Sequence, residues 1–308
     1  VGEQIKSADY CTVRRGKYHA CCYQRRAGLL AAYSAEQRAR RCARKTWCAA
    51  GLDDSLLYWG WLSQGRRTGF GAIQQQPGRP YPHGGMESMC SPIIQEIEVK
   101  SILSKSNLPV CEYSVNPYVG CTHGCRYCYA SFMKRFTGHT EPWGTFLDVK
   151  VWPKIKNPKK YAGKELFIGS VTDPYLPQEE RYGRTRALLE QLKGSGAKIS
   201  IATKSDLILR DLDLIKTFPD ARVSWSVNTL DEDFKNDMDN AISIERRLAA
   251  MEAFYHAGIR TTCFVSPIFP GITDVEAIIQ RVKKQCNLIW LENLNLRGNY
   301  KVEIMDYI

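Results

Sequence analysis

From residue 113 onward, short apolar runs rich in β-branched residues alternate with amphipathic stretches of helical length. The short runs predict strands at residues 113–119, 165–170, 198–203, 222–227, 260–265 and 288–294. Helices are expected at residues 184–192, 206–218, 243–256 and 273–285. Strands that alternate with crossover helices form a parallel sheet with right-handed connections. Because a full eight-unit barrel takes about 250 residues, we expect an α/β fold with a partial, TIM-like barrel of six units.

Residues 1–88 differ in composition from the rest of the chain. They hold 14 of the 43 Lys and Arg residues but only six of the 32 Asp and Glu residues, so most of the net charge of +11 lies there. They show no clean helical or strand period and run into a Gln- and Pro-rich linker. We expect a disordered or spurious leader, read through from upstream of a true start at Met86 or Met89; a basic nucleic-acid arm is the alternative.

The core domain is expected at residues 89–308, cut short at its C-terminal end because the chain stops within an apolar pattern. A run of 18 apolar residues is lacking, and the first 30 residues do not resemble a secretion signal. We therefore expect a cytoplasmic protein whose 12 cysteines are reduced thiols or metal ligands. Cys263 and Cys286 fit buried apolar positions. Cys111 fits a loop thiol, with metal binding as the alternative.

Three cysteines follow the first predicted strand with the spacing C-x3-C-x2-C, namely Cys121, Cys125 and Cys128. Thiolates this close can surround one soft metal centre. Three ligands to a four-iron cluster leave one iron open. A structural zinc site is the alternative, because His123 would complete a Cys3His set. The position favours iron, since chemistry in barrel-like sheets takes place at the carboxyl ends of the strands.

The cysteine motif and the segments after the later strands together resemble the radical S-adenosylmethionine (radical SAM) superfamily. The segments after strands two to five resemble its spore photoproduct lyase-like branch. These segments are residues 169–175, 202–204, 224–229, 245–248 and 266–268. The Asn-Pro-Tyr-x-Gly-Cys-x-His-x-Cys stretch that starts at Asn116 and the sequel at residues 132–136 are similar, more closely still, to radical SAM mobile pair protein B.

The resemblance implies a partial barrel of the radical SAM type and a 4Fe-4S cluster on the three cysteines. The open iron would bind S-adenosylmethionine. Electron transfer from the reduced cluster would then give methionine and a 5'-deoxyadenosyl radical, which takes a hydrogen atom from an unidentified substrate. The implied partners are a low-potential electron donor, either ferredoxin or flavodoxin, and a second radical SAM protein encoded nearby. Nucleic acid is a possible substrate.

The resemblance also assigns roles to residues at the strand ends. Tyr127 is expected beside the adenine, and Lys204 and Ser226 at the carboxylate or ribose of S-adenosylmethionine. The other residues expected to line the cofactor cavity are Thr172, Asn228 and Arg247. Lys204 could instead be a solvated loop lysine, and Ser226 a plain strand serine that alternates with Trp225.

Asp173 and Ser170 are the candidate catalytic residues, although an aspartate before Pro174 also often shapes a turn. Ser170 stands where the photoproduct lyase motif would have the cysteine that returns a hydrogen atom to the product. We therefore do not expect photoproduct lyase activity.

The sequence leaves a second class of function open. The protein could be a basic nucleic-acid-binding module that is stabilised by zinc or an iron-sulfur cluster and has no catalytic activity. The Lys-rich residues 143–161 would be its electrostatic footprint, or else a solvated crossover.

Overall fold

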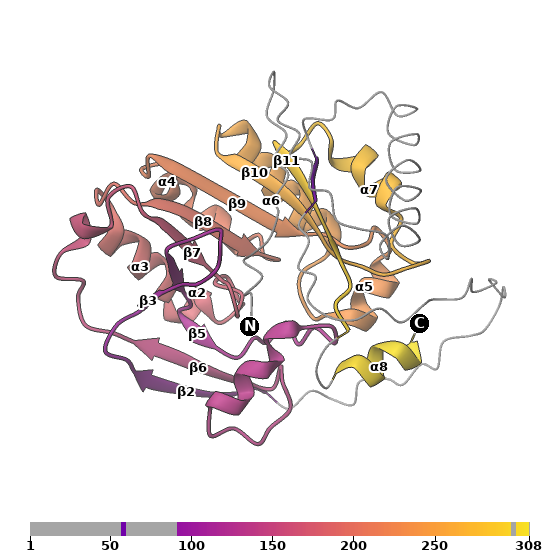
Figure 1. Ribbon diagram of the computed structural model, residues 1–308, viewed down its shortest axis with the longest axis horizontal. Coiled ribbons are helices and arrows are strands. Elements are labelled where there is room, and N and C mark those ends of the chain that lie inside the picture. Colours follow the sequence, from indigo (N-terminus) through magenta and orange to yellow (C-terminus); the bar gives the residue numbers. More distant parts are fainter. Residues whose placement is uncertain (1–56, 60–90, 297–299, 308) are drawn as a thin grey trace, which may run out of the picture.

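The computed structural model describes residues 57–59, 91–296 and 300–307. Within them, two sheets lie side by side, a large one and a small one (Figure 1). The large sheet has the spatial order β1 (Leu57–Trp59), β11 (Leu288–Asn293), β10 (Arg260–Ile268), β9 (Asp220–Ser226), β8 (Lys198–Thr203), β7 (Glu165–Ile168), β4 (Tyr113–Val115) and β3 (Leu103–Lys105). The small sheet has the order β2 (Ile93–Glu98), β6 (Phe146–Val151) and β5 (Tyr118–Val119).

The strands β4, β7, β8, β9, β10 and β11 are neighbours and pair in parallel. Five of them lie at predicted strands, and β4 is the first half of the remaining one, so the α/β fold with a partial six-unit barrel is confirmed. Alternate side chains on these strands, such as Ile201, Trp225 and Val265, are fully buried in one continuous core. The residues between them, such as Ser226 and Ser266, are only half-buried and line the concave face of the sheet.

Helices lie between the strands and after the last one. They are α2 (Glu179–Tyr182), α3 (Arg184–Leu192), α4 (Leu212–Ile215), α5 (Glu232–Met238), α6 (Ile244–His256), α7 (Val275–Val282) and α8 (Tyr300–Tyr307), with 3-10 helices η2 (Tyr129–Phe136), η3 (Pro158–Tyr161) and η4 (Leu207–Asp211). Side-chain caps start three of the helices. Asp231 accepts the backbone N–H groups of residues 233 and 234, Ser243 that of Arg246, and Asp274 that of Ala277.

The first predicted strand, residues 113–119, is in fact two strands in different sheets. β4 ends at Val115, and β5 begins at Tyr118 and pairs antiparallel with β6. Pro117 lies between them and has no backbone N–H to donate to a ladder, which favours a break at this position. Asn116 fixes the turn, because its side chain accepts the N–H of Val171 at 3.0 Å. The chain therefore crosses from the large sheet to the small one just before the cysteines.

Two other predictions differ from the structure. Residues 143–161 are not simply a solvated crossover, because they contain β6, whose first four residues are buried. Four of the predicted footprint lysines in this stretch are exposed, namely Lys154, Lys156, Lys159 and Lys160. The helix predicted at residues 206–218 is a 3-10 turn followed by the four-residue α4, because the Ser205 hydroxyl accepts the N–H of Leu207 and tightens its start.

The predicted leader lies outside the described residues except for Leu57–Trp59. These three residues form β1, which pairs in parallel with β11 at the edge of the large sheet. The division of the chain at residue 88 stays a prediction. In the described part of the chain, every helix is too short or too polar to cross a membrane.

Candidate active site at the carboxyl ends of the strands

The three cysteines lie on a buried loop that follows β5. The Cys121 carbonyl accepts the N–H of Gly124 at 3.1 Å, and the Cys125 carbonyl accepts that of Cys128 at 3.0 Å. Burial raises the pKa of each of the three thiols, that of Cys125 to about 12. The negative charges of Cys125 and Cys128 raise the pKa of Cys121 further. Two buried thiols, Cys121 and Cys125, and the partly buried thiol of Cys128 fit a site for a positively charged metal centre, which would stabilise the thiolates.

The fourth ligand of the zinc alternative, His123, is paired with a carboxylate. Among the described residues, no group of three or more His, Cys, Asp or Glu side chains has the geometry to hold a metal ion. His123 is only 2% exposed, and its Nε2 lies 3.0 Å from Asp173 Oδ2. Its Nδ1 is buried and has no partner in the described part of the chain. The donor set therefore consists of three soft thiols, which suits an iron-sulfur cluster.

A charged network lies beside this loop and brings together three of the predicted cofactor residues. The Lys204 ammonium donates to the Tyr127 hydroxyl at 2.7 Å and to Asp239 Oδ2 at 3.1 Å. Tyr127 also donates to Asp239, at 3.0 Å, and Arg247 donates to Asp239 Oδ1 at 2.8 Å. Lys204 is not a solvated loop lysine, since it is only 9% exposed.

Asp239 is the central residue of this network, and the sequence analysis missed it. Burial would raise its pKa, but Lys204 and Arg247 hold it well below the ordinary value. The signal available in the sequence was indirect: two cations predicted in one cavity require an anion. Arg247 is fully buried and also donates to the carbonyls of Ile242 and Ser226, so it supports the wall of the site from behind.

Both oxygens of the Asp173 carboxylate accept hydrogen bonds from neighbouring groups. Its carboxylate accepts the Thr203 hydroxyl at 2.7 Å and the backbone N–H groups of Lys204 and Tyr175 at 2.7 and 2.8 Å, besides its contact with His123. Burial would raise the pKa of Asp173, but His123 and these donors keep it below the ordinary value. The bond to Tyr175, two residues on, is an Asx turn. These contacts favour the turn-shaping alternative for Asp173.

Ser170 and Thr172 follow β7 and form hydrogen bonds to β4 and to the cysteine loop. The Ser170 hydroxyl lies 2.5 Å from that of Ser114 and accepts from the Asn116 amide at 3.0 Å. The Ser170 carbonyl accepts the hydroxyl of Tyr129, the residue after the third cysteine. Thr172 donates to the carbonyl of Gly120 at 2.6 Å. Ser170 therefore lies close to the cysteine loop.

The ends of β9, β10 and β11 complete the concave face. Trp225 turns into the core, where it contacts Phe254 of α6, so Ser226 is on the opposite, concave side. Asn228 is 2% exposed, and its amide nitrogen has no acceptor among the described residues. Glu292, which the sequence analysis did not single out, accepts from Ser266 at 2.8 Å, and burial raises its pKa.

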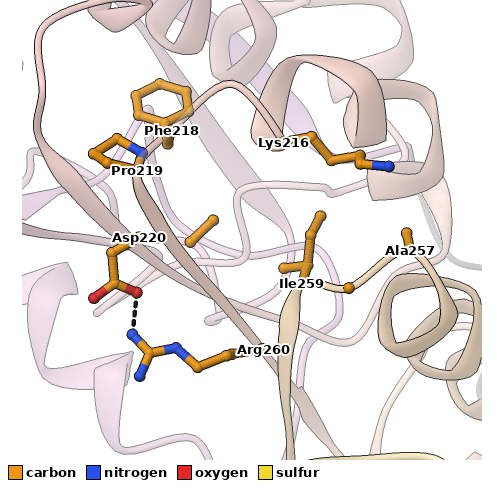
Figure 2. A pocket seen from close by; sticks show the side chains of 9 residues that line it. Lys216, Phe218, Pro219, Asp220, Ala257, Ile259 and Arg260 are labelled. Atoms are coloured by element: carbon orange, nitrogen blue, oxygen red, sulfur yellow. Dashed lines mark hydrogen bonds and ion pairs between the residues drawn. The ribbon is translucent and has the colours of Figure 1, made fainter.

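A separate shallow pocket lies at the opposite end of the sheet. It is between the amino ends of β9 and β10, where Asp220 pairs with Arg260 (Figure 2). The cysteines and the Asp239 network are at the carboxyl ends of the strands. This pocket is therefore not part of the candidate site.

A sequence model of the radical SAM superfamily matches residues 115–282, which include the cysteine loop and the Asp239 network. The chain belongs to the radical SAM superfamily. Membership implies S-adenosylmethionine cleavage chemistry, and radical SAM enzymes normally use a 4Fe-4S cluster and an electron donor. The alternative of a nucleic-acid-binding module without catalysis is not supported.

Proteins similar to this radical SAM chain include one from an archaeon and one from a phage. An uncharacterized protein of Methanocaldococcus jannaschii is 36% identical over 208 residues, which are 67% of this chain and 79% of that protein. The radical SAM Nalpha-GlyT isomerase of Pseudomonas phage M6 is 28% identical over 173 residues, which are 54% of this chain and 36% of the isomerase.

A solved structure of a spore photoproduct lyase variant with bound AdoMet and dinucleoside spore photoproduct has a similar fold. The TM-score is 0.52 at 16% identity, and the match covers 70% of this chain and 65% of that one. This likeness concerns the fold alone. It agrees with the predicted branch at the level of architecture.

Proposed function

We propose that the protein is a radical SAM enzyme that holds a 4Fe-4S cluster on Cys121, Cys125 and Cys128. When bound and reduced, the cluster supplies one electron that breaks the sulfonium bond of S-adenosylmethionine, which yields methionine and a 5'-deoxyadenosyl radical that takes a hydrogen atom from the substrate. The observation that carries the proposal is the group of three thiols, two buried and one partly buried, beside the Asp239 network at the strand ends of a superfamily member.

The residues around the loop suit a zwitterionic cofactor. The Lys204 ammonium has three N–H donors, and Tyr127 and Asp239 take two of them. The third is available for the carboxylate of S-adenosylmethionine. The amide of Asn228 is buried and has no acceptor in the described part of the chain. We assign this amide and the hydroxyl of Ser226 to the ribose. Tyr127 is assigned to the adenine, and Thr172 and Arg247 hold the cavity walls through their backbone partners.

Substrate is assigned to the concave face between Ser170 and Glu292. Burial raises the pKa of Glu292, and its carboxyl group, which accepts from Ser266, is the candidate to hydrogen-bond the substrate. Asp173 acts as a positioning residue that fixes His123 and the backbone of Lys204. The dinucleoside in the similar lyase structure makes nucleic acid the first substrate class to test. The substrate-derived radical receives its hydrogen atom from a group other than a cysteine after β7, because residue 170 at this position is a serine.

The partners follow from the chemistry. A ferredoxin or flavodoxin is the proposed source of the low-potential electron. The likeness to mobile pair protein B supports a second radical SAM protein encoded nearby. Reduced thiols and such donors are found in the cytoplasm, where we expect the protein to act.

Anaerobic reconstitution tests the proposal. The full chain should turn brown, bind iron and sulfide in equal amounts, and release 5'-deoxyadenosine from S-adenosylmethionine after reduction with dithionite. Cys125→Ala should lose both the cluster and 5'-deoxyadenosine formation, because two remaining thiols do not hold the cluster. Cys263→Ala is the matched control, since Cys263 is a fully buried core thiol on β10. A colourless protein with stoichiometric zinc, or a Cys125→Ala variant that keeps its iron, would contradict the proposal.

A further inference from the structure

The 3-10 helix η2 carries a row of exposed aromatic and basic side chains directly after the third cysteine. Among the described residues, the exposed large aromatic side chains are Tyr129, Phe132 and Phe136, and all three belong to η2. They are 59, 41 and 67% exposed, respectively. A 3-10 helix has three residues per turn, so side chains three positions apart are eclipsed. Tyr129, Phe132 and the exposed Arg135 therefore lie in one row on the outside of this helix, with Phe136 beside it.

The guanidinium of Arg135 contacts aromatic rings and not a carboxylate. Its central carbon lies 5.3 Å from the ring centroid of Phe132 and 4.7 Å from that of Phe136. It has no carboxylate partner in the described part of the chain. An exposed arginine elsewhere, Arg260, pairs with Asp220. The N–H groups of Arg135 are therefore free to bind an anion, and the planar guanidinium suits a phosphate.

The surroundings of this row are basic and adjoin the candidate active site. Residues 121–140 contain three Lys and Arg residues but no Asp or Glu. Lys134 uses one of its three N–H donors on the Thr140 carbonyl, at 2.7 Å. The first residue of the row, Tyr129, donates to the carbonyl of Ser170 after β7. The row therefore begins at the face to which we assign the substrate and extends along η2 over the surface.

We propose that η2 is a platform that binds a single-stranded nucleic acid beside the active site. Bases stack on Phe132 and Phe136, and Lys134 and Arg135 bind the phosphates. Every base has a flat π face, so aromatic side chains and a few cations together bind a single strand with little sequence preference. Exposed rings fit unpaired bases, because bases in a duplex are stacked on one another. The inference rests on the proposed function and names the class of its substrate; continuity with the substrate face favours a substrate over a docked protein.

Fluorescence anisotropy with a labelled oligothymidylate tests the stacking on the reconstituted full chain. Phe136→Leu keeps an apolar side chain but removes the ring, so it should raise the Kd about tenfold. Phe136→Tyr keeps the ring and should bind as the wild type does. The wild type should bind a duplex of the same length more weakly than the single strand. Equal Kd values for Phe136→Leu and the wild type, or tighter binding of the duplex, would overturn the inference.

The salt dependence of binding tests the phosphate contact separately. A cation that neutralises one phosphate of a single strand adds about 0.7 to the slope of log Kd against log salt concentration. Arg135→Gln should therefore reduce this slope by about 0.7. Arg260→Gln is the matched control, because Arg260 is an exposed arginine at the opposite, amino ends of the strands, and it should leave the slope unchanged. A wild-type slope in Arg135→Gln, or an equal reduction in Arg260→Gln, would contradict the phosphate contact.

Failure of this inference can be told apart from failure of the proposed function. If the wild-type chain releases 5'-deoxyadenosine but does not bind the single strand, only the platform is wrong. If it binds the strand through Phe136 but assembles no cluster, only the proposed function is wrong. An acidic electron donor is the other occupant that the charges allow. If Phe136→Leu slows reduction by flavodoxin and leaves oligothymidylate binding unchanged, η2 docks the donor and the inference is wrong.

Discussion

At the scale of single residues, Asp239 has the largest effect on the site because two buried cations depend on it. Lys204 and Arg247 both donate to its carboxylate, and Arg247 is fully buried. Asp239→Asn should lower the free energy of unfolding by about 3–5 kcal/mol, because it leaves buried charges without compensation. Urea denaturation measures this. Asp220→Asn, which breaks the solvent-accessible pair with Arg260, is the control and should cost about 1 kcal/mol or less.

The same carboxylate predicts how stability depends on pH. The pKa of Asp239 in the folded protein lies below its ordinary value. Its contribution to stability is therefore fully present above the unfolded pKa of about 4 and is lost as the pH falls toward the folded pKa. Urea midpoints measured from pH 7 down to pH 3 should fall more steeply for the wild type than for Asp239→Asn. Equal slopes would show that the network does not depend on this charge.

Ser170 tests the exclusion of photoproduct repair. A serine O–H is a far poorer hydrogen-atom donor than a thiol, and the sequence has no cysteine between Cys128 and Cys263. The reduced wild-type enzyme should recover no thymine from an oligonucleotide that contains the spore photoproduct. Ser170→Cys places a thiol beside Ser114 and Asn116 and should gain measurable recovery. Catalytic turnover by the wild type would refute the exclusion.

At the scale of elements, the small sheet supports the cysteine loop. Gly144 has a φ of +101°, and a Cβ there would collide with Gly124. Gly144→Ala should therefore cost about 1–3 kcal/mol of backbone strain and reduce the iron bound per chain after reconstitution. Gly163→Ala is the control, because its φ is also positive but a Cβ there has open space. Equal iron content in the two variants would mean that the contact does not position the loop.

Elements formed by local sequence were the easier part to predict. Ser243 and Asp274 cap α6 and α7 near the predicted starts, because a cap needs only its own first turn. The small sheet was not predicted. β5 has two residues, and β2 and β6 pair across about 50 positions of the chain. Whether such short apolar segments pair depends on partners that are distant in sequence.

At the scale of the whole molecule, the predicted leader is expected to be dispensable for chemistry. Deleting residues 1–88 should leave iron content and 5'-deoxyadenosine formation unchanged, because the leader lacks a periodic apolar face. The deletion also removes β1 from the edge of the large sheet, so we expect any loss to be in thermal stability. Iron content and product formation, measured beside the full chain, test this. Loss of cluster assembly would mean that the leader belongs to the catalytic domain.

The sequence by itself determined the parallel strands of the large sheet, three of the helices between them and the position of the three cysteines after the first predicted strand. All of these depend on residues close together in the chain, since periodicity, caps and ligand spacing are local. Only the tertiary structure decided the partners of these residues. Tyr127 and Asp239 are 112 positions apart and share a hydrogen bond, and Gly144 lies against Gly124 of the cysteine loop. Which residues meet around that loop is set by how distant segments pack, and local sequence carries no record of that geometry.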